Sequence, residues 1–548
     1  MNCFSSCNIV RYATKRFSSG ATGFKSRYLR YLLYFLSMNN GSIYKMTRMK
    51  RVISFTLINF LAIFLCLWKL HANPLELNVK EHVLRNGLKL LMMEKHNVPI
   101  VCLRINFRVG SVDERPGITG VSHLFEHMMF KGTKIFGTKD YAAEKPLLDK
   151  EDALVAEIAW EKGMETQDRE KIAALEKELE TTREKLRDMV VKDEIFSLYL
   201  RHGAVGLNAA TSSDGTFYIC DIPANKLELW AFIESDRMKN RVLREFYSER
   251  DVVMEERRLR VETSPFGALI EQLNAVTFIA HPYRLPTIGW RSDIQNVTKA
   301  ETAEYFERYY SPNNAVIVIV GDFQPENAIK LVEKYFGDIP RQPDPPKVKT
   351  IEPEQKGERR IEVEFDSNPY MAISYHIPGI GHQDIYALDV LSSLLSEGRT
   401  SRLYKSMIEG KRIAVMANAG IGIGRFPETF TFYAAPRAPH TVEEVEKAFY
   451  EEVELLKTKP PSEWELQKIK NQLEASFIRS LDSSSGLAGQ IGHYEILSDW
   501  RYINTFLEKV SEVTAEDVMR VAKKYLNKRN RTVAMLVKKE NGNGESAK

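Results

Sequence analysis

The chain has 548 residues, of which 44% are hydrophobic and 27% are charged. This composition excludes a largely disordered chain, and the length exceeds what one hydrophobic core holds, so two or more domains are expected. The net charge is only +4, from 77 basic and 73 acidic residues, which gives no support for nucleic-acid binding.

Residues 1–72 have the character of a leader. Val52–Trp68 is an uncharged, mostly apolar run that follows basic residues and precedes the small residue Ala72. This order is typical of a secretory signal peptide and predicts export, to the periplasm in a bacterium. The run 52–68 also reaches the lower length limit of a membrane span, so an uncleaved membrane tether is the alternative. Residues 1–45 are rich in Arg and Ser and lack acidic residues, which keeps a mitochondrial location open.

The first folded segments have the alternation of strands. Arg85–Leu88 is a turn between two apolar alternating runs and predicts a hairpin. Val101–Val109 alternates like a half-buried strand, and a helix is expected to start near Gly120.

A charged helical insertion interrupts the first domain at about residues 145–197. Ile172, Leu179 and Leu186 recur every seven residues, which is coiled-coil spacing, and a turn is expected near Gly163. We interpret this segment as a helical hairpin that forms a solvated structural arm, because charged stripes of this kind usually serve packing and solubility. A docking role is the alternative.

The remaining chain divides at a proline-rich segment. Thr216–Ile222 predicts a strand and Ala315–Val320 a buried strand, and helices follow both. Residues 338–358 contain five prolines and many charges, which is typical of a linker. Beyond it the alternation of strands and helices repeats. We therefore predict a first domain over 77–337 and a similar second domain over 359–540.

The strongest chemical signal is His123-Leu124-Phe125-Glu126-His127. Residues four apart share one helix face, so His123 and His127 can offer imidazole nitrogens to one zinc ion. Zinc lowers the pKa of a bound water, and the adjacent Glu126 is placed to accept its proton as general base. The alternative is a pair of helix histidines satisfied by hydrogen bonds.

Two histidines leave a zinc site one protein ligand short, so a distant acidic residue must supply it. The segment Glu249–Glu256 is the best candidate. Glu249 and Glu256 are seven residues apart and share a helix face, whereas Glu255 points about 100° away from Glu256. We predict Glu256 as the third ligand of one Zn²⁺ per chain, and Glu249 as a supporting carboxylate.

The sequence around the histidines, Gly117–Thr133, resembles the pitrilysin/insulinase family of zinc metallopeptidases with an inverted motif. The resemblance extends over about Leu77–Val537 and is strongest to half-length bacterial members related to the mitochondrial processing peptidase. It implies an α+β protein with two homologous α/β-sandwich domains, of which only the first binds metal. The family pattern also matches Glu249-Arg250-x-Val252-Val253-x-x-Glu256, which implies zinc ligation by Glu256 and support from Glu249.

The resemblance also implies a substrate-binding edge strand at Asn208, Ala209, Ala210 and Thr211. An extended peptide would add to this strand through main-chain hydrogen bonds, a mode that tolerates many side chains. Without the resemblance, an ordinary turn before a strand is the simpler interpretation.

One departure from the family concerns the second domain. Active members carry an Arg and a Tyr, seven residues apart, after a Ser-Arg-Leu-Tyr segment, and these help to hold substrate. Here Ser401–Tyr404 is present, but Ile408 and Val415 occupy those two positions. We therefore expect a catalytic half that works as a homodimer, or as a heterodimer with a homologous zinc-free subunit.

The predicted function is a zinc metalloendopeptidase that hydrolyses peptides or unfolded protein segments, with Glu126 as general base. One alternative is a non-catalytic structural or assembly subunit of the same family. Another is a metal-binding module without peptidase activity.

Overall fold

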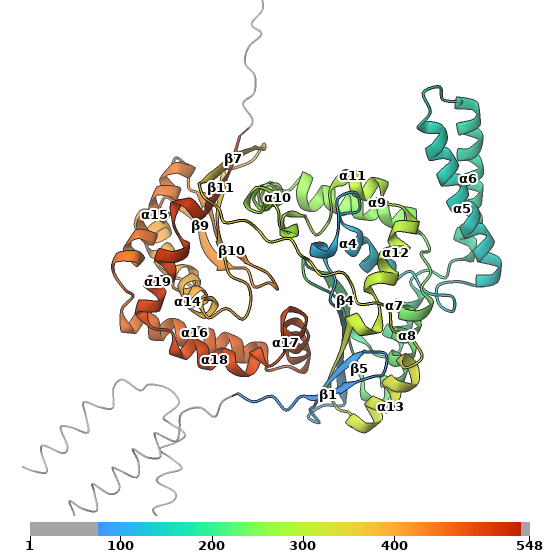
Figure 1. Cartoon of the computed structure of the whole chain (residues 1–548), viewed down its shortest axis with the longest axis horizontal. Helices are drawn as coiled ribbons and strands as arrows, with labels where there is room; N and C mark the ends of the chain where they lie inside the picture. Colours follow the sequence, from blue (N-terminus) through green and yellow to red (C-terminus); the bar gives the residue numbers. More distant parts are fainter. Residues whose placement is uncertain (1–74, 539–548) are drawn as a thin grey trace, which may run out of the picture. The chain divides into compact units, whose positions relative to one another are not determined.

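The computed structural model describes residues 75–538, which contain two mixed β-sheets with helices packed against them (Figure 1). The first sheet has the order β1-β2-β6-β3-β5-β4, in which only β2 and β6 run parallel. Its strands are β1 (Lys80–Val83), β2 (Lys89–Glu94), β3 (Ile100–Phe107), β4 (Val205–Thr211), β5 (Thr216–Pro223) and β6 (Ala315–Gly321).

The second sheet repeats this arrangement without a counterpart of β1. Its order is β7-β11-β8-β10-β9, and only β7 and β11 run parallel. Its strands are β7 (Arg359–Glu364), β8 (Tyr370–Ile377), β9 (Ala414–Ile421), β10 (Glu428–Pro436) and β11 (Arg531–Val537). Strand β9 thus corresponds to β4, and the β9–β10 turn corresponds to the β4–β5 turn. The predicted α+β fold with two similar halves is confirmed.

Helices of the first half cover one face of its sheet. Leu103, Ile105 and Phe107 of β3 lie in one buried apolar cluster with Phe125. The helices that surround the site or support it are α4 (Val121–Met128), α7 (Glu194–Arg201), α8 (Leu227–Asn240), α9 (Phe246–Arg257), α10 (Pro265–Thr277), α11 (Arg291–Asn296), α12 (Lys299–Tyr309) and α13 (Pro325–Phe336).

The other face of the first sheet packs against the second half. Helix α17 (Ser484–Leu497) contacts β3 and β6, and Cys102 of β3 belongs to the apolar core of the second half. Because both of its faces are covered, every residue of β6 is buried, which explains why that strand is a continuous apolar run. The other helices of the second half are α14 (Asp384–Ser396), α15 (Val442–Thr458), α16 (Glu463–Ser480), α18 (Tyr502–Glu512) and α19 (Ala515–Tyr525).

The charged insertion forms the expected pair of helices, α5 (Tyr141–Lys162) and α6 (Arg169–Met189), which project as an arm in Figure 1. Helix α5 ends at Lys162 and Gly163 caps it, at the position where a turn was predicted. The heptad residue Leu179 packs against Leu154 and Ile158, so the two helices bury a small apolar seam of their own.

The segment between the two sheets contains neither helix nor strand over residues 340–358. It is nevertheless anchored, because the Glu352 carboxylate accepts hydrogen bonds from the backbone amides of Ile279, Ala280 and His281. The predicted leader lies outside the described residues. Within residues 75–538, no helix is both long and apolar enough to cross a membrane.

Candidate metal centre

The metal motif lies on α4, and the start of this helix is tightly held. The buried Glu114 carboxylate accepts hydrogen bonds from the backbone amides of Gly120 (2.7 Å) and Ser122 (2.8 Å), which satisfies two N–H groups that a helix N-terminus leaves unpaired. Gly120 has a φ of 87°, and a Cβ there would approach the Ile288 carbonyl oxygen to 2.5 Å. A glycine is therefore required at this position.

Three side chains converge at one point. Nε2 of His123 lies 3.6 Å from Oε2 of Glu256, and Nε2 of His127 lies 3.5 Å from the same oxygen. Ligand atoms bound tetrahedrally at about 2.0–2.1 Å from a zinc ion lie roughly 3.3–3.4 Å from one another. The three side chains therefore fit a zinc ion, and their chemistry, two imidazoles and one carboxylate, is that of a catalytic zinc site with one position left for solvent or substrate.

Helix α9 presents Glu256 through one oxygen. The other carboxylate oxygen, Oε1, pairs with Arg260 at 2.7 Å. Arg260 lies in η4 (Arg258–Glu262), a π-helical turn that directly follows α9. The neighbouring Glu255 points outward and pairs with Arg258, so the structure brings Glu256 rather than Glu255 to the histidines.

Glu249 lies beside the cluster, where the sequence placed a supporting carboxylate. Its Oε2 is 3.3 Å from Nδ1 of His127, and its Oε1 is 2.5 Å from Nζ of Lys131. Although burial lowers the pKa of His127, its hydrogen bonds to Glu249 and Glu256 raise it to about 9 in the absence of a metal. Burial lowers the pKa of His123 to about 4, so that imidazole is neutral and ready to act as a ligand.

Glu126 points from α4 to the end of strand β4. The hydroxyl of Thr211 donates a hydrogen bond of 2.6 Å to Oε2 of Glu126. Burial raises the pKa of Glu126, and the bond from Thr211 opposes this effect. A half-enclosed carboxylate with a raised pKa in this position is suited to accept a proton from a solvent molecule beside the cluster.

Strand β4 is the outermost strand of its sheet. Asn208, Ala209 and Ala210 pair with β5 on one side, and in residues 75–538 no strand pairs with the other side. The backbone groups on that side are therefore available to an added peptide strand. Thr211 ends the strand, so the free edge runs directly up to Glu126.

Several contacts of the site are not apparent in the sequence. Lys131 and Glu245, which form a 3.4 Å ion pair with each other, extend the network around Glu249. Thr211 was predicted only as part of the edge strand, and its hydroxyl contact with Glu126 joins residues 85 positions apart. Nδ1 of His123 is buried and has no hydrogen-bond partner among the described residues.

The second half offers no side-chain donor at the two positions where the family has Arg and Tyr. Ile408 is half-buried and packs against the second core, and Val415 is 56% exposed on β9. Neither residue can donate a side-chain hydrogen bond to a peptide.

Comparison with known proteins identifies the family. Residues 89–145 match the family described as insulinase (peptidase family M16), and residues 296–473 match the domain described as peptidase M16 inactive domain. Parts of both halves of the chain thus match models of the insulinase family, M16, in agreement with the resemblance predicted from the motif around His123 and His127.

Similar proteins cover nearly the same length. The zinc protease PqqE of Helicobacter pylori is 28% identical over 460 residues, which is 83% of this chain and 91% of that protein. The mitochondrial-processing peptidase subunit beta of Lentinula edodes is 22% identical over 81% of this chain and 86% of its own. The crystal structure of a protease from Helicobacter pylori superposes with a TM-score of 0.71 at 27% identity, covering 84% of this chain and 99% of that one.

Proposed function

We propose that this protein is a zinc metalloendopeptidase that cleaves peptides or unfolded protein segments. The observation that carries the proposal is the convergence of His123, His127 and Glu256, with Glu126 beside them at the end of a free strand edge. When bound, zinc would activate a water molecule for attack on the scissile carbonyl. The names of the relatives, which include zinc proteases, support the same chemistry.

The residues of the chain divide the work. His123, His127 and Glu256 would hold the ion, and Glu249 would orient His127 through Nδ1. Glu126 would take the proton of the attacking water and pass it to the leaving amine. Thr211 would hold that carboxylate in place.

Substrate would bind by strand addition along Asn208, Ala209, Ala210 and Thr211. Main-chain hydrogen bonds supply the affinity in this mode, so extended segments would bind with little dependence on their side chains. Folded proteins present few such segments. This favours short peptides and unfolded stretches as substrates.

We further propose that the active form is a dimer, with a second copy or a zinc-free homologue. Ile408 and Val415 leave the second half without the side-chain donors that family members use to hold substrate. A zinc-free homologue that carries the Arg and Tyr would supply them, whereas a second copy has the same Ile408 and Val415. Size-exclusion chromatography with light scattering, with and without a co-expressed homologue, tests this, and a fully active monomer would contradict it.

The apolar run 52–68 supports export, and N-terminal sequencing of the mature protein checks it.

The function is tested by metal analysis and a quenched-peptide cleavage assay on three proteins. The wild type should bind one zinc ion per chain and cleave. Glu126→Gln should bind zinc and fail to cleave, whereas Glu255→Gln is the matched control and should do both, because Glu255 points away from the site. Zinc binding without cleavage in the wild type would favour the non-catalytic alternative, since the match to residues 296–473 is to a domain described as inactive.

A further inference from the structure

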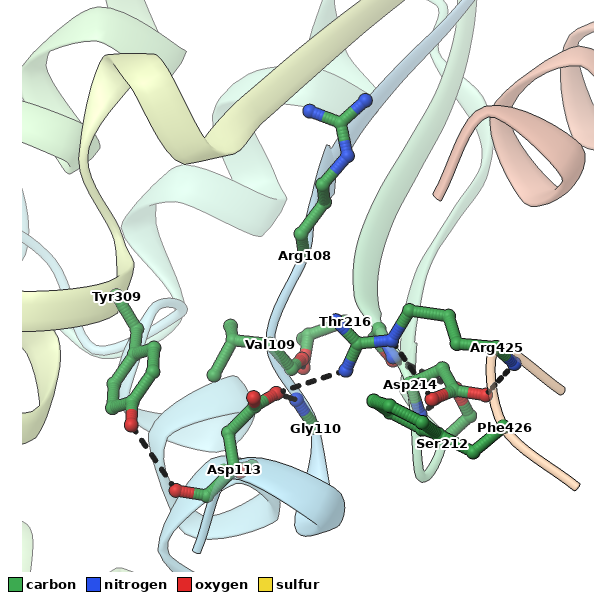
Figure 2. A network of polar contacts seen from close by, with 12 residues as sticks. Arg108, Val109, Gly110, Asp113, Ser212, Asp214, Thr216, Tyr309, Arg425 and Phe426 are labelled. Atoms are coloured by element: carbon green, nitrogen blue, oxygen red, sulfur yellow. Dashed lines mark hydrogen bonds and ion pairs between the residues drawn. The ribbon is translucent and has the colours of Figure 1, made fainter. Parts of the chain in front are cut away.

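The two halves of the chain meet at corresponding turns of their sheets. The β4–β5 turn carries Asp214, and the β9–β10 turn carries Arg425. Figure 2 shows the Arg425 side chain reaching from the second half into the space between Asp214 and Asp113. These three residues form a charged contact between the two halves.

Arg425 makes three hydrogen bonds to the first half. Its Nε donates to Oδ1 of Asp214 at 2.9 Å, and its backbone N–H donates to Oδ2 of the same carboxylate at 3.1 Å. Its guanidinium also donates to Oδ2 of Asp113 at 3.2 Å (Figure 2). The hydroxyl of Tyr283 also donates a 2.6 Å hydrogen bond to Oδ2 of Asp214.

The two carboxylates that Arg425 joins belong to segments that already touch through their backbones. Asp113 ends η2 (Ser111–Asp113), and the amides of Ser111 and Val112 donate to the carbonyls of Ser212 and Ser213 in the β4–β5 turn. A Cβ on Gly110 would come within 2.2 Å of the Ser212 oxygen, so the approach is close. Arg425 therefore acts on a single unit made of both segments.

Each segment leads directly to the site. The residue after Asp113 is Glu114, whose carboxylate holds the N-terminus of α4, the helix that carries both histidines. Asp214 is three residues beyond Thr211, whose hydroxyl binds Glu126. A displacement of one segment against the other would therefore move the start of α4 relative to the end of β4.

The charges require the arginine. The side chains of Asp113 and Asp214 are only 5% and 7% exposed, and the Asp214 carboxylate raises the pKa of Asp113. Burial raises the pKa of Asp113 to about 6, although the charge of Arg425 lowers it. Without a cation the two carboxylates would repel each other in a space that solvent screens poorly.

We propose that Arg425 is a positioning residue for catalysis, through which the second half holds the substrate-binding edge strand and the metal-bearing helix in register. This inference rests on the proposed peptidase function for its kinetic part only. The second half, which has lost the two usual substrate-holding side chains, thus contributes through a different residue. Arg425 touches neither the metal ligands nor Glu126.

The test compares Arg425→Gln and Arg425→Lys with Arg360→Gln in the full chain. Arg360 is the matched control, because it also pairs with a mostly buried acid, Glu446, at 2.5 and 2.9 Å, but both partners lie in the second half. Two readouts are measured well below the melting temperature: hydrogen exchange of peptides covering 108–114 and 208–216, and kcat and KM per bound zinc ion.

Arg425→Gln should speed exchange in both segments by about tenfold or more, because charge-assisted hydrogen bonds that hold them are lost. Its kcat per bound zinc should fall by about tenfold or more while its zinc content stays at one per chain. Arg425→Lys keeps the positive charge but loses the planar guanidinium that donates to two carboxylates at once. Its exchange rates and its kcat should therefore lie between those of the wild type and Arg425→Gln. Arg360→Gln should change neither.

Unchanged exchange in both segments of Arg425→Gln would overturn the proposal, as would an equal loss of kcat in Arg360→Gln. Faster exchange with unchanged kcat per zinc would reduce Arg425 to a structural role and would also overturn it. If the wild type binds zinc but cleaves no peptide, the proposed function fails instead. The exchange data then decide separately whether Arg425 holds the two segments.

Discussion

Removal of the Thr211 hydroxyl tests whether its hydrogen bond positions Glu126, the proposed general base. Thr211→Val keeps the shape of the side chain and removes only the donor that binds Glu126 at 2.6 Å. A short hydrogen bond to a charged carboxylate is worth about 1.5–3 kcal/mol. If the bond serves to hold Glu126 for proton transfer, its loss should lower kcat by about 10- to 100-fold, since each 1.36 kcal/mol is a factor of ten.

The assay is steady-state cleavage of a quenched peptide at saturating zinc, with zinc content measured on the same samples. Thr211→Ser restores a hydroxyl and should recover most of kcat. Thr431→Val is the matched control, because it removes a hydroxyl that bonds Ser374 at 2.9 Å in the second half, and it should leave kcat unchanged. A kcat of Thr211→Val within twofold of the wild type would refute the assigned role of this contact.

Three further predictions concern metal binding and stability. Glu256→Gln should weaken zinc affinity by about 100-fold or more, measured by competition with a chelating dye, whereas Glu255→Gln should leave it unchanged. Equal zinc affinities of the two variants would show that Glu256 is not a ligand. Arg244 is 1% exposed and donates hydrogen bonds of 2.5 and 2.8 Å to Glu144. Glu144→Gln removes the counter-charge of this buried arginine and should therefore lower the free energy of unfolding by about 3–5 kcal/mol. An unchanged melting temperature would contradict this. Burial raises the pKa of Glu428 from 4.5 to about 7 in the folded protein. Ionisation of Glu428 therefore lowers the free energy of unfolding by its full amount above about pH 7, and this loss disappears below about pH 4.5, the pKa in the unfolded chain. Glu428→Gln should therefore raise the free energy of unfolding at pH 8 by up to about 3 kcal/mol, with a gain that shrinks toward pH 5, and a gain independent of pH would refute the reasoning.

Local patterns predicted much of the fold. The heptad at Ile172, Leu179 and Leu186 located α6, and Gly163 located the turn before it, because both depend on neighbours in sequence. The pairing of the halves followed from a repeated order of strands and helices. In the site, the helical period alone separated Glu256 from Glu255.

Elements with weak local signals were not predicted. Strand β9 is built largely from Ala, Gly and Asn, which have low strand propensity, and α17 contains three glycines, which disfavour helix. Packing explains α17: a Cβ on Gly492 would come within 2.7 Å of the Asn106 side chain, so the small residues allow the helix to lie close to β3. Tertiary contacts override propensity in both cases.

The contacts that complete the site join residues far apart in the chain. Thr211 and Glu126 are 85 positions apart, and Arg425 and Asp214 are 211 apart. A single sequence contains no periodic signal for such pairs, because their proximity arises only when the sheets have formed and packed. The metal ligands were an exception, since the chemistry of zinc required a third ligand and limited where to look for it.

In the proposed enzyme, His123, His127 and Glu256 hold zinc at the end of the free edge of β4. A crystal structure of zinc-loaded Glu126→Gln with a bound peptide tests it most directly, using anomalous scattering at the zinc edge. We expect a zinc peak about 2.0–2.1 Å from both Nε2 atoms and from one oxygen of Glu256, with the peptide paired to Asn208–Thr211. Zinc bound elsewhere, or a peptide that leaves the edge of β4 free, would contradict it.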